Sequence, residues 1–141
     1  MKKRVMCFGT FDILHPGHIK FLTAARKLGD ELYVVVSRDA RREKASGRLP
    51  VHTQAERVLM LGSLSVVARA IPGAAKDILA VIRTHKPAII ALGHDQVYGV
   101  DVLRAWCAGQ KNAPKIVRLR AFNRARYSTS RIKSAVCQPA L

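Results

Sequence analysis

The sequence predicts an α/β fold, with one Rossmann-like domain around a mostly parallel five-stranded sheet. Short apolar runs alternate with helical patterns along the chain, as in sheets built with right-handed crossovers. Residues 31–37 include an unbroken apolar run, which is typical of a strand buried on both faces. No internal repeat, linker or low-complexity tract divides the 141 residues. We therefore expect a single domain over residues 1–141.

The strands are indicated by short apolar runs bounded by turn residues. We predict strands at residues 4–8, 31–37, 66–71, 88–92 and 116–119. Pro72 and Gly73 turn the chain after the third strand, and Gly93 ends the fourth. Because helices separate these strands in the sequence, neighbouring strands are expected to be parallel.

The helices are indicated by apolar residues at helical spacing and by signals at their ends. We predict helices at residues 19–28, 53–61, 74–85, 100–108 and 128–136. Gly29 follows the first helix, in the position where glycine commonly ends one. Thr53 and Glu56 have the spacing of a capping box at the start of the second helix. Residues 38–52 have no clean period and are predicted to form a loop.

The composition restricts the class of protein. At 49% hydrophobic residues the chain can form a real core. No apolar run is as long as a membrane span, and the basic N-terminus leads into a strand rather than a signal-peptide core. We therefore expect a cytoplasmic protein without a membrane partner. Cys7, Cys107 and Cys137 lack metal-ligand spacing, and the first two are expected to be buried.

Residues 9–18, with the sequence GTFDILHPGH, carry the most specific functional signal. They join the first strand to the first helix, and such a helix start attracts anions through its free N–H groups and its dipole. Pro16 suits the first helical position and keeps His15 extended. Gly17 leaves the helix start open to a ligand. The alternative is that His15 and His18 are ordinary polar turn residues capping a helix, but the framed pair favours a phosphate site.

This segment resembles the signature of the HxGH nucleotidyltransferases, the cytidylyltransferase-like superfamily. Similar segments follow in the family's order at residues 37–39, 54–57, 92–96 and 127–132, so the resemblance spans nearly the whole chain. It is strongest to the small archaeal FAD synthases and next to the glycerol-3-phosphate cytidylyltransferases. In this family both histidines contact the nucleotide phosphates and stabilise the transition state at the α-phosphorus. The archaeal proteins often carry paired cysteines near the C-terminus, where this chain has only Cys137, whose role stays open.

The resemblance implies a set of site residues, most of them just after a predicted strand. The implied catalytic residues are His15, His18, Lys44 and Arg131. The implied ATP-binding residues are Gly9, Thr10, Phe11, His15, Pro16, Gly17, His18, Arg57, Gly93, Asp95, Tyr127, Ser128 and Thr129. Because ligands of open α/β sheets bind beyond the carboxyl ends of the strands, we expect these segments to converge on one crevice. No residue is implied as a metal ligand, and Asp12 is expected to be structural.

Several of these residues also have a structural interpretation. Arg57 matches a family arginine near the triphosphate, but a surface charge on its helix is nearly as consistent with the sequence. Loops like that around Asp95 are common, and the resemblance places its carboxylate near the ribose or base. Ser128 and Thr129 are either plain N-caps or phosphate ligands, because capping and anion binding use the same geometry. Lys44 matches a loop lysine that reaches the phosphates in relatives.

The formal net charge is +16 and the sequence pI is about 10.8. Basic residues cluster within residues 38–48 and again after Asp101, beyond which no acidic residue follows. This excess of positive charge has three interpretations: a solvated basic surface, a site for polyanionic substrates, or a surface that binds nucleic acid. The clusters coincide with segments that the resemblance assigns to substrates, which favours ATP and FMN. Few aromatic residues lie among the basic ones, so no specific nucleic-acid partner is expected.

The resemblance implies that the FMN phosphate attacks the ATP α-phosphorus in line, which transfers AMP and gives FAD and pyrophosphate. An ionised phosphate needs no general base, in agreement with the absence of an obvious carboxylate–histidine pair. Mg²⁺ is expected to be bound through the nucleotide phosphates. The alternatives are a cytidylyltransferase acting on glycerol 3-phosphate or a similar phosphorylated alcohol, and a non-catalytic basic nucleic-acid-binding domain. The choice between ATP and CTP, the acceptor, the metal and the oligomeric state stay open, although relatives are often homodimers.

Overall fold

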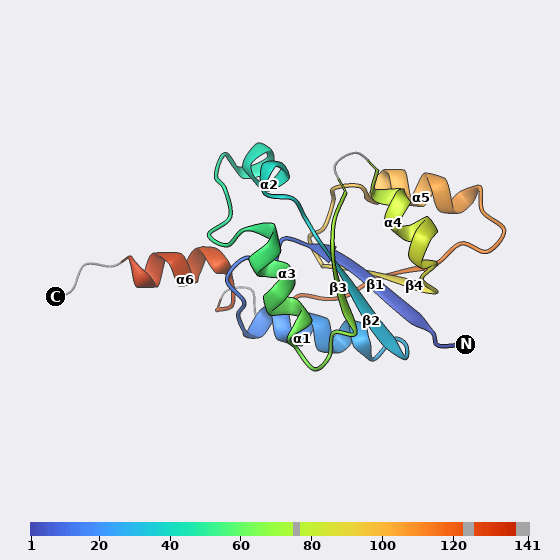
Figure 1. Ribbon diagram of the computed structural model, residues 1–141, viewed down its shortest axis with the longest axis horizontal. Helices are drawn as coiled ribbons and strands as arrows, with labels where there is room; N and C mark the ends of the chain where they lie inside the picture. The colour runs from blue at the N-terminus through green and yellow to red at the C-terminus, as the bar shows by residue number, and fades with distance from the viewer. Residues whose placement is uncertain (75–76, 123–125, 138–141) are drawn as a thin grey trace.

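The structure is a computed structural model that describes residues 1–74, 77–122 and 126–137. In this part of the chain, five parallel strands form one sheet in the order β3-β2-β1-β4-β5 (Figure 1). The strands are β1 (Arg4–Gly9), β2 (Glu31–Val36), β3 (Arg69–Pro72), β4 (Ile89–Leu92) and β5 (Lys115–Arg118). The chain adds β2 and β3 on one side of β1, and then β4 and β5 on the other. In open α/β sheets, ligands bind at such a reversal, beyond the carboxyl ends of the strands. The predicted fold class is confirmed.

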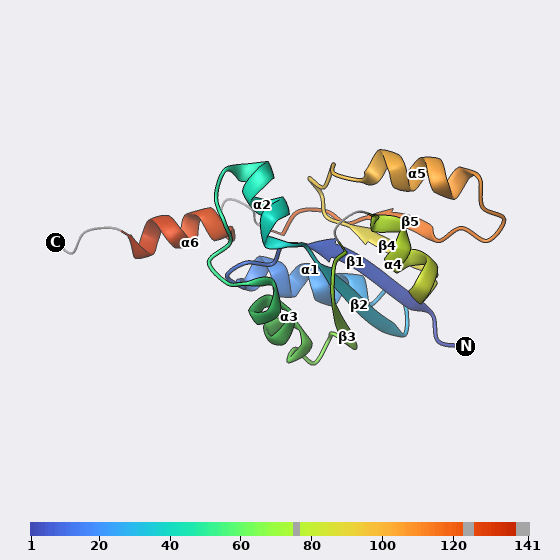
Figure 2. The same cartoon turned by 45° about the horizontal axis from the view of Figure 1, so that its top comes forward.

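Helices cover both faces of the sheet. They are α1 (Pro16–Arg26), α2 (Asp39–Ser46), α3 (Gln54–Gly62), α4 (Ile78–His85), α5 (Val100–Ala108) and α6 (Thr129–Val136). α1 and α3 pack on one face, and α4 and α5 pack on the other (Figures 1 and 2). Successive side chains of β1 point to opposite faces of the sheet. Val5 and Cys7 pack with α1 and α3, whereas Met6 packs with α4 and α5. β1 is therefore buried on both sides, which explains its unbroken apolar run.

Residues 38–52 are not the continuous loop that the sequence predicts, because they contain α2. Asp39 in its first turn complements the helix dipole, and Gly47, with φ of 74°, ends the helix. No residue of α2 is buried, so the helix lacks the apolar stripe from which a helical period is detected. Lys44 consequently lies on a helix rather than in a loop.

The other predicted elements are present with small shifts at their ends. α1 begins three residues earlier than predicted because His15 provides its N-cap. β3 begins three residues later than predicted, where its pairing with β2 starts. α3 carries the predicted capping box. α4 is observed from Ile78, with Asp77 as its N-cap, and the predicted helical residues 75–76 lie outside the described residues.

The cysteines differ in their environment. Cys7 is buried in β1 as predicted, and burial raises the pKa of its thiol. Cys107 is only half-buried, contrary to the prediction, because it lies in the last turn of α5 beyond the buried Val100 and Leu103. Cys137 is exposed. No helix in the described ranges is long and apolar enough to cross a membrane.

α6 extends away from the sheet (Figures 1 and 2), and none of its residues is buried. Its first turn is attached to the loop that follows β1. The hydroxyl of Thr129 donates a hydrogen bond to the carbonyl oxygen of Asp12 (2.8 Å). The ammonium of Lys133 lies 3.6 Å from the Asp12 carboxylate. The last helix is therefore anchored at the carboxyl edge of the sheet.

Candidate active site

The segments that follow β1, β2, β4 and β5 meet at the carboxyl edge of the sheet. The hydroxyl oxygens of Thr10 and Ser37, which follow β1 and β2, are 3.0 Å apart. Arg118, at the end of β5, donates a hydrogen bond to the carbonyl oxygen of Gly93 after β4 (2.7 Å). A Cβ on Gly17 would lie 3.1 Å from the Cβ of Tyr127, so the segment before α6 reaches the start of α1. The structure brings together segments that are far apart in the sequence.

His15 and His18 form a reciprocal cap at the start of α1. His15 Nδ1 accepts a hydrogen bond from the backbone N–H of Gly17 (3.1 Å), and His18 Nδ1 accepts one from the backbone N–H of His15 (3.3 Å). The two imidazoles are stacked, with centroids 3.7 Å apart and planes inclined by 24°. This is a capping box made of two histidines. The histidines do cap the helix, and the same bonds orient both rings.

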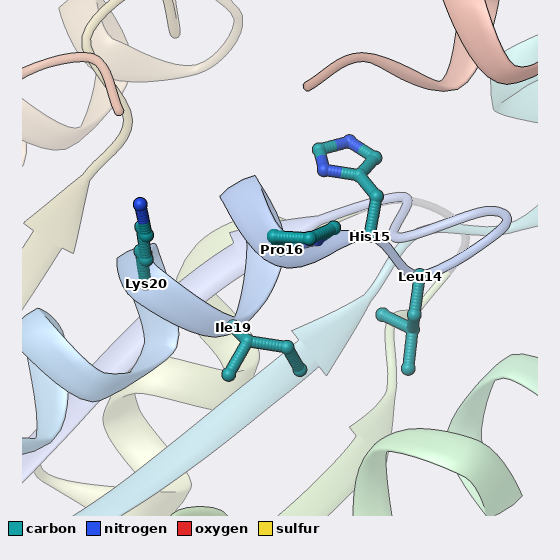
Figure 3. Close-up of a pocket in the computed structure, with 5 residues that line it drawn as sticks. All are labelled: Leu14, His15, Pro16, Ile19 and Lys20. Atoms are coloured by element: carbon teal, nitrogen blue, oxygen red, sulfur yellow. The ribbon is translucent and has the colours of Figure 1, made fainter. Parts of the chain in front are cut away.

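The cap also fixes the protonation of the pair. Because each Nδ1 accepts a hydrogen bond, the proton of each neutral ring is on Nε2. Burial lowers the pKa of His15. Burial and the neighbouring His15 lower the pKa of His18 to about 4, against the opposing effect of Asp12. At neutral pH the helix start therefore presents two neutral Nε2–H donors, and the His15 imidazole projects from that start in Figure 3.

The loop before these histidines is strained and firmly anchored. Phe11 and Ile13 have φ angles of 51° and 48°, in the left-handed region that is unfavourable for residues with a side chain. Between them, the buried Asp12 carboxylate accepts hydrogen bonds from the backbone N–H groups of Val51 (2.8 Å) and His52 (3.0 Å). Burial opposes ionisation of Asp12, but these bonds and the nearby lysine together lower its pKa. Asp12 thus has the structural role expected of it.

Two glycines let aromatic rings fold over the motif. A Cβ on Gly9 would lie 2.6 Å from the ring of Phe11, and one on Gly17 would lie 2.8 Å from Cε1 of His15. Phe11 in turn contacts His18 edge to face, with centroids 5.5 Å apart. A side chain at either glycine would therefore displace a ring of the site.

Arg57 is fully buried, so its interpretation as a surface charge is wrong. Its guanidinium donates hydrogen bonds to the carbonyl oxygens of Thr10 (2.8 Å), Ser37 (2.9 Å) and His52 (3.1 Å). It also donates to the Asp39 carboxylate (2.6 Å). These bonds join the ends of β1 and β2 to the starts of α2 and α3. With an exposed fraction of 0%, the Arg57 side chain has no surface that a ligand could contact in this structure.

The loop after β4 is held in place by hydrogen bonds from Arg118, at the end of β5. Besides Gly93, the Arg118 guanidinium donates to the carbonyl oxygen of Gln96 (2.9 Å). The side chain of Asp95 is largely exposed on this loop, and its carboxylate lies 3.8 Å from Nδ1 of His94. Asp95 therefore lies on a fixed backbone with its carboxylate accessible.

Ser128 and Thr129, at the start of α6, make hydrogen bonds within the protein that leave part of each hydroxyl group's hydrogen-bonding capacity unused. Ser128 Oγ accepts a hydrogen bond from the backbone N–H of Arg131 (3.2 Å), which leaves its O–H group as a donor. Thr129 donates to Asp12, as described above, and retains acceptor capacity. The ammonium of Lys20 lies 5.2 Å from the centroid of the Tyr127 ring. Lys20 was not predicted, since nothing in its spacing marks it as a site residue.

Two surface hollows lie beside the predicted segments. One, of about 500 Å³, is lined by Leu14, His15, Pro16, Ile19 and Lys20 (Figure 3). The other, of about 460 Å³, is lined by Arg126, Arg131, Ile132, Ser134 and Ala135. Lys44 and Arg131 are exposed. Among the described residues, no hydrogen bond, ion pair or ring contact joins the side chain of either to the histidine pair.

Residues 6–135 match the family model described as cytidylyltransferase-like. The chain belongs to the cytidylyltransferase-like family. It is 41% identical over 116 residues to a curated FAD synthase of Methanosarcina mazei, covering 82% of this chain and 76% of that protein. It is 37% identical over 135 residues to the FAD synthase of Thermoplasma volcanium, covering 96% and 94% respectively.

A solved structure supports the same family relationship. The crystal structure titled as the lipopolysaccharide core biosynthesis protein from Thermoplasma volcanium is 39% identical to this chain, with a TM-score of 0.79. The similarity covers 87% of this chain and all of that one. The predicted resemblance and the predicted nucleotidyltransferase class are therefore confirmed for this member of the cytidylyltransferase-like family. The roles of its individual site residues stay a prediction.

Proposed function

We propose that this protein transfers the AMP moiety of ATP to FMN, giving FAD and pyrophosphate. A phosphate oxygen of FMN forms a bond to the ATP α-phosphorus, and the bond from that phosphorus to the bridging oxygen of the pyrophosphate breaks. The acceptor is inferred from the relatives named FAD synthase, which are similar over most of their length. The observation that carries nucleotidyl transfer is the stacked His15–His18 pair at a helix start, in which each Nδ1 accepts a capping hydrogen bond and each neutral ring carries its proton on Nε2.

The histidines act on the phosphate under attack. Their Nε2–H groups donate to its oxygens, where negative charge is held as the new bond forms and the old one breaks. The N-terminal dipole of α1 adds to this effect. Because the cap fixes both rings before substrate binds, no reorientation of the donors is needed. The FMN phosphate is already ionised at neutral pH, so the reaction requires no general base.

The remaining predicted residues complete the ATP site in this proposal. Tyr127, Ser128 and Thr129 contact the β and γ phosphates from the start of α6, and Asp95 contacts the ribose or base. Lys44 and Arg131 neutralise the leaving pyrophosphate. Both side chains are exposed: Lys44 lies on α2, which follows β2, and Arg131 lies in the first turn of α6, which is anchored at the carboxyl edge through Thr129. In this proposal they contact the phosphates when substrate is bound.

A divalent cation, which we expect to be Mg²⁺, belongs to the substrate in this proposal. In the described part of the chain, no group of three histidine, cysteine or acidic residues is arranged to hold a metal ion. The buried carboxylate beside the motif, Asp12, is committed to Val51, His52 and Lys133. In this proposal the nucleotide phosphates themselves bind the cation, and the cation neutralises part of their negative charge. We also propose a cytoplasmic location, a homodimeric assembly and no specific nucleic-acid partner.

The experiment that tests the function crosses two nucleotides with two acceptors. Pyrophosphate release is measured with ATP or CTP, each with FMN or glycerol 3-phosphate, in the presence of Mg²⁺, and FAD is identified by chromatography. We expect turnover with ATP and FMN, with FAD and pyrophosphate formed in equal amounts. Turnover with CTP and glycerol 3-phosphate in place of this pair would overturn the proposal and establish the cytidylyltransferase alternative.

A further inference from the structure

Lys133 lies on the face of α6 that is turned toward the loop after β1. Its ammonium is 3.6 Å from the Asp12 carboxylate, and the hydroxyl of Thr129 donates to the carbonyl oxygen of Asp12 (2.8 Å). Thr129 and Lys133 are an i, i+4 pair, so they share one face of the helix. Among the described residues, every hydrogen bond and ion pair that joins α6 to another segment ends on Asp12.

α6 needs this attachment because it is too short to be stable alone. It has eight residues and none of them is buried, whereas an isolated helix shorter than about 12–15 residues is marginal in water. Its first turn contains no acidic residue to complement the helix dipole. α6 extends away from the sheet (Figures 1 and 2), and the two hydrophobic clusters of the described chain include none of its residues. Besides its own N-cap, the contacts with Asp12 therefore hold it in place.

Asp12 is a fixed partner for this ion pair. Its side chain is only 7% exposed, and its carboxylate accepts hydrogen bonds from the backbone N–H groups of Val51 (2.8 Å) and His52 (3.0 Å). An ion pair between two exposed side chains is weakened because both must be ordered to form it. Here the carboxylate is already held, so only the Lys133 side chain has to be ordered.

The attachment joins the starts of two helices. Asp12 lies in the loop that leads to His15 and α1, and it holds α6 through Thr129 in the first turn. A Cβ on Gly17 would lie 3.1 Å from the Cβ of Tyr127, so the segment that enters α6 adjoins the start of α1. The position of α6 relative to the histidine pair therefore depends on what Asp12 holds.

We propose that Lys133 is a positioning residue for ATP: its ion pair with Asp12 keeps the start of α6 beside the histidine pair before the nucleotide binds. The inference rests on the proposed function, which assigns Ser128, Thr129 and Arg131 to the phosphates. Lys133 acts through Asp12 and does not itself contact the nucleotide. If α6 is attached for only a fraction of the time, the affinity for ATP falls in proportion to that fraction.

Hydrogen exchange of the free protein measures the attachment without any substrate. In Lys133→Met the amides of α6 should exchange about two- to fivefold faster, the range for loss of an ion pair that has an exposed partner. Lys133→Arg keeps the charge and the reach and should restore the wild-type rate. Lys111→Met makes the same chemical change between α5 and β5, at the amino edge of the sheet, and should leave α6 unchanged. The urea midpoint should stay at the wild-type value in all three, because α6 has no buried residue.

Calorimetry with ATP and Mg²⁺ then shows whether the attachment matters for the nucleotide. In Lys133→Met the Kd for ATP should rise by about the same two- to fivefold, whereas the KM for FMN should stay at the wild-type value. Lys133→Arg should restore ATP binding, and Lys111→Met should not change it.

Three results would overturn the inference. Unchanged exchange in Lys133→Met would show that the ion pair does not hold α6. Weaker ATP binding with unchanged exchange would assign Lys133 to the nucleotide itself. Faster exchange with an unchanged Kd for ATP, or with an equal rise in the KM for FMN, would show that the attachment does not position α6 for ATP. Failure of wild type to form FAD would instead overturn the proposed function, because exchange and ATP affinity are measured without the acceptor.

Discussion

Arg57→Met tests whether one buried guanidinium holds the segments that carry the site. The substitution keeps an unbranched side chain and removes four hydrogen bonds, three of them to the carbonyl oxygens of Thr10, Ser37 and His52. A hydrogen bond from a charged donor contributes about 1.5–3 kcal/mol, and an unsatisfied buried carbonyl costs a similar amount. The loss is reduced because a charge no longer has to be buried.

These opposing effects give an expected loss of about 3–5 kcal/mol in the free energy of unfolding, as for other broken buried charge networks. A domain of this size has about 5–15 kcal/mol in total, so the change is large but measurable. Urea unfolding followed by circular dichroism supplies the value. Arg42→Met makes the same chemical change on the exposed face of α2 and should stay within about 0.5 kcal/mol of wild type.

Arg57→Lys separates the charge from the geometry. An ammonium keeps the positive charge but cannot reach four acceptors in the fork that the guanidinium spans. Its stability should fall between wild type and Arg57→Met, and its kcat should fall because Thr10 and Ser37 are no longer tied together. A loss below about 1 kcal/mol for Arg57→Met, equal to that of the Arg42→Met control, would refute this account of the carboxyl edge.

Three other results are expected. His18→Ala should abolish pyrophosphate release while circular dichroism shows an intact fold. Gly17→Ala should lower kcat by about 100-fold, because its Cβ would lie 2.8 Å from Cε1 of His15 and move that donor. Stability should fall in acid: the His18 pKa is about 4 in the folded chain against an ordinary 6.5, so its contribution is complete above pH 6.5. That contribution should shrink by roughly 2–3 kcal/mol as the pH falls to about 4.5.

Each of these results has its own control. Turnover by His18→Ala would contradict the role of its Nε2–H group. Gly62→Ala is the control for Gly17→Ala, because it adds the same methyl group at a helical glycine where the new Cβ would make only an ordinary contact at 3.8 Å. An equal loss of kcat in both variants would show that the loss does not come from displacement of His15. For the acid transition, urea midpoints are compared between wild type and His18→Gln. An equal decrease in both would assign the pH dependence to other groups.

The histidine corner was predictable because its determinants are local. Pro16 and Gly17 set the start of α1 through their own backbone preferences, and His15 lies where an N-cap is required. The alternation of strands and helices likewise follows from apolar spacing, since the sheet is buried on both faces. Capping by the two histidines was one of the sequence-based alternatives, but the local pattern did not indicate that the cap is reciprocal or that the two rings stack.

The parts that escaped prediction depend on tertiary contacts. α2 has no buried face, so the absence of an apolar period concealed a helix that is stabilised at its ends. Arg57 lies in an ordinary helical position, and only the fold brings three carbonyl oxygens around it. Arg41 and Tyr98 are far apart in the sequence and meet because β2 and β4 flank β1. No spacing rule connects such residues.

Asp12 and Arg57 show why an otherwise apolar interior contains two charges. In the described ranges they are the buried charged residues, and they serve complementary backbone groups. Asp12 accepts from the N–H groups of Val51 and His52, whereas Arg57 donates to the carbonyl oxygens of His52, Thr10 and Ser37. The irregular segments at the carboxyl edge have no ladder to satisfy their buried backbone groups. The strained loop is therefore held by one anion and one cation, which make the bonds that regular structure supplies elsewhere.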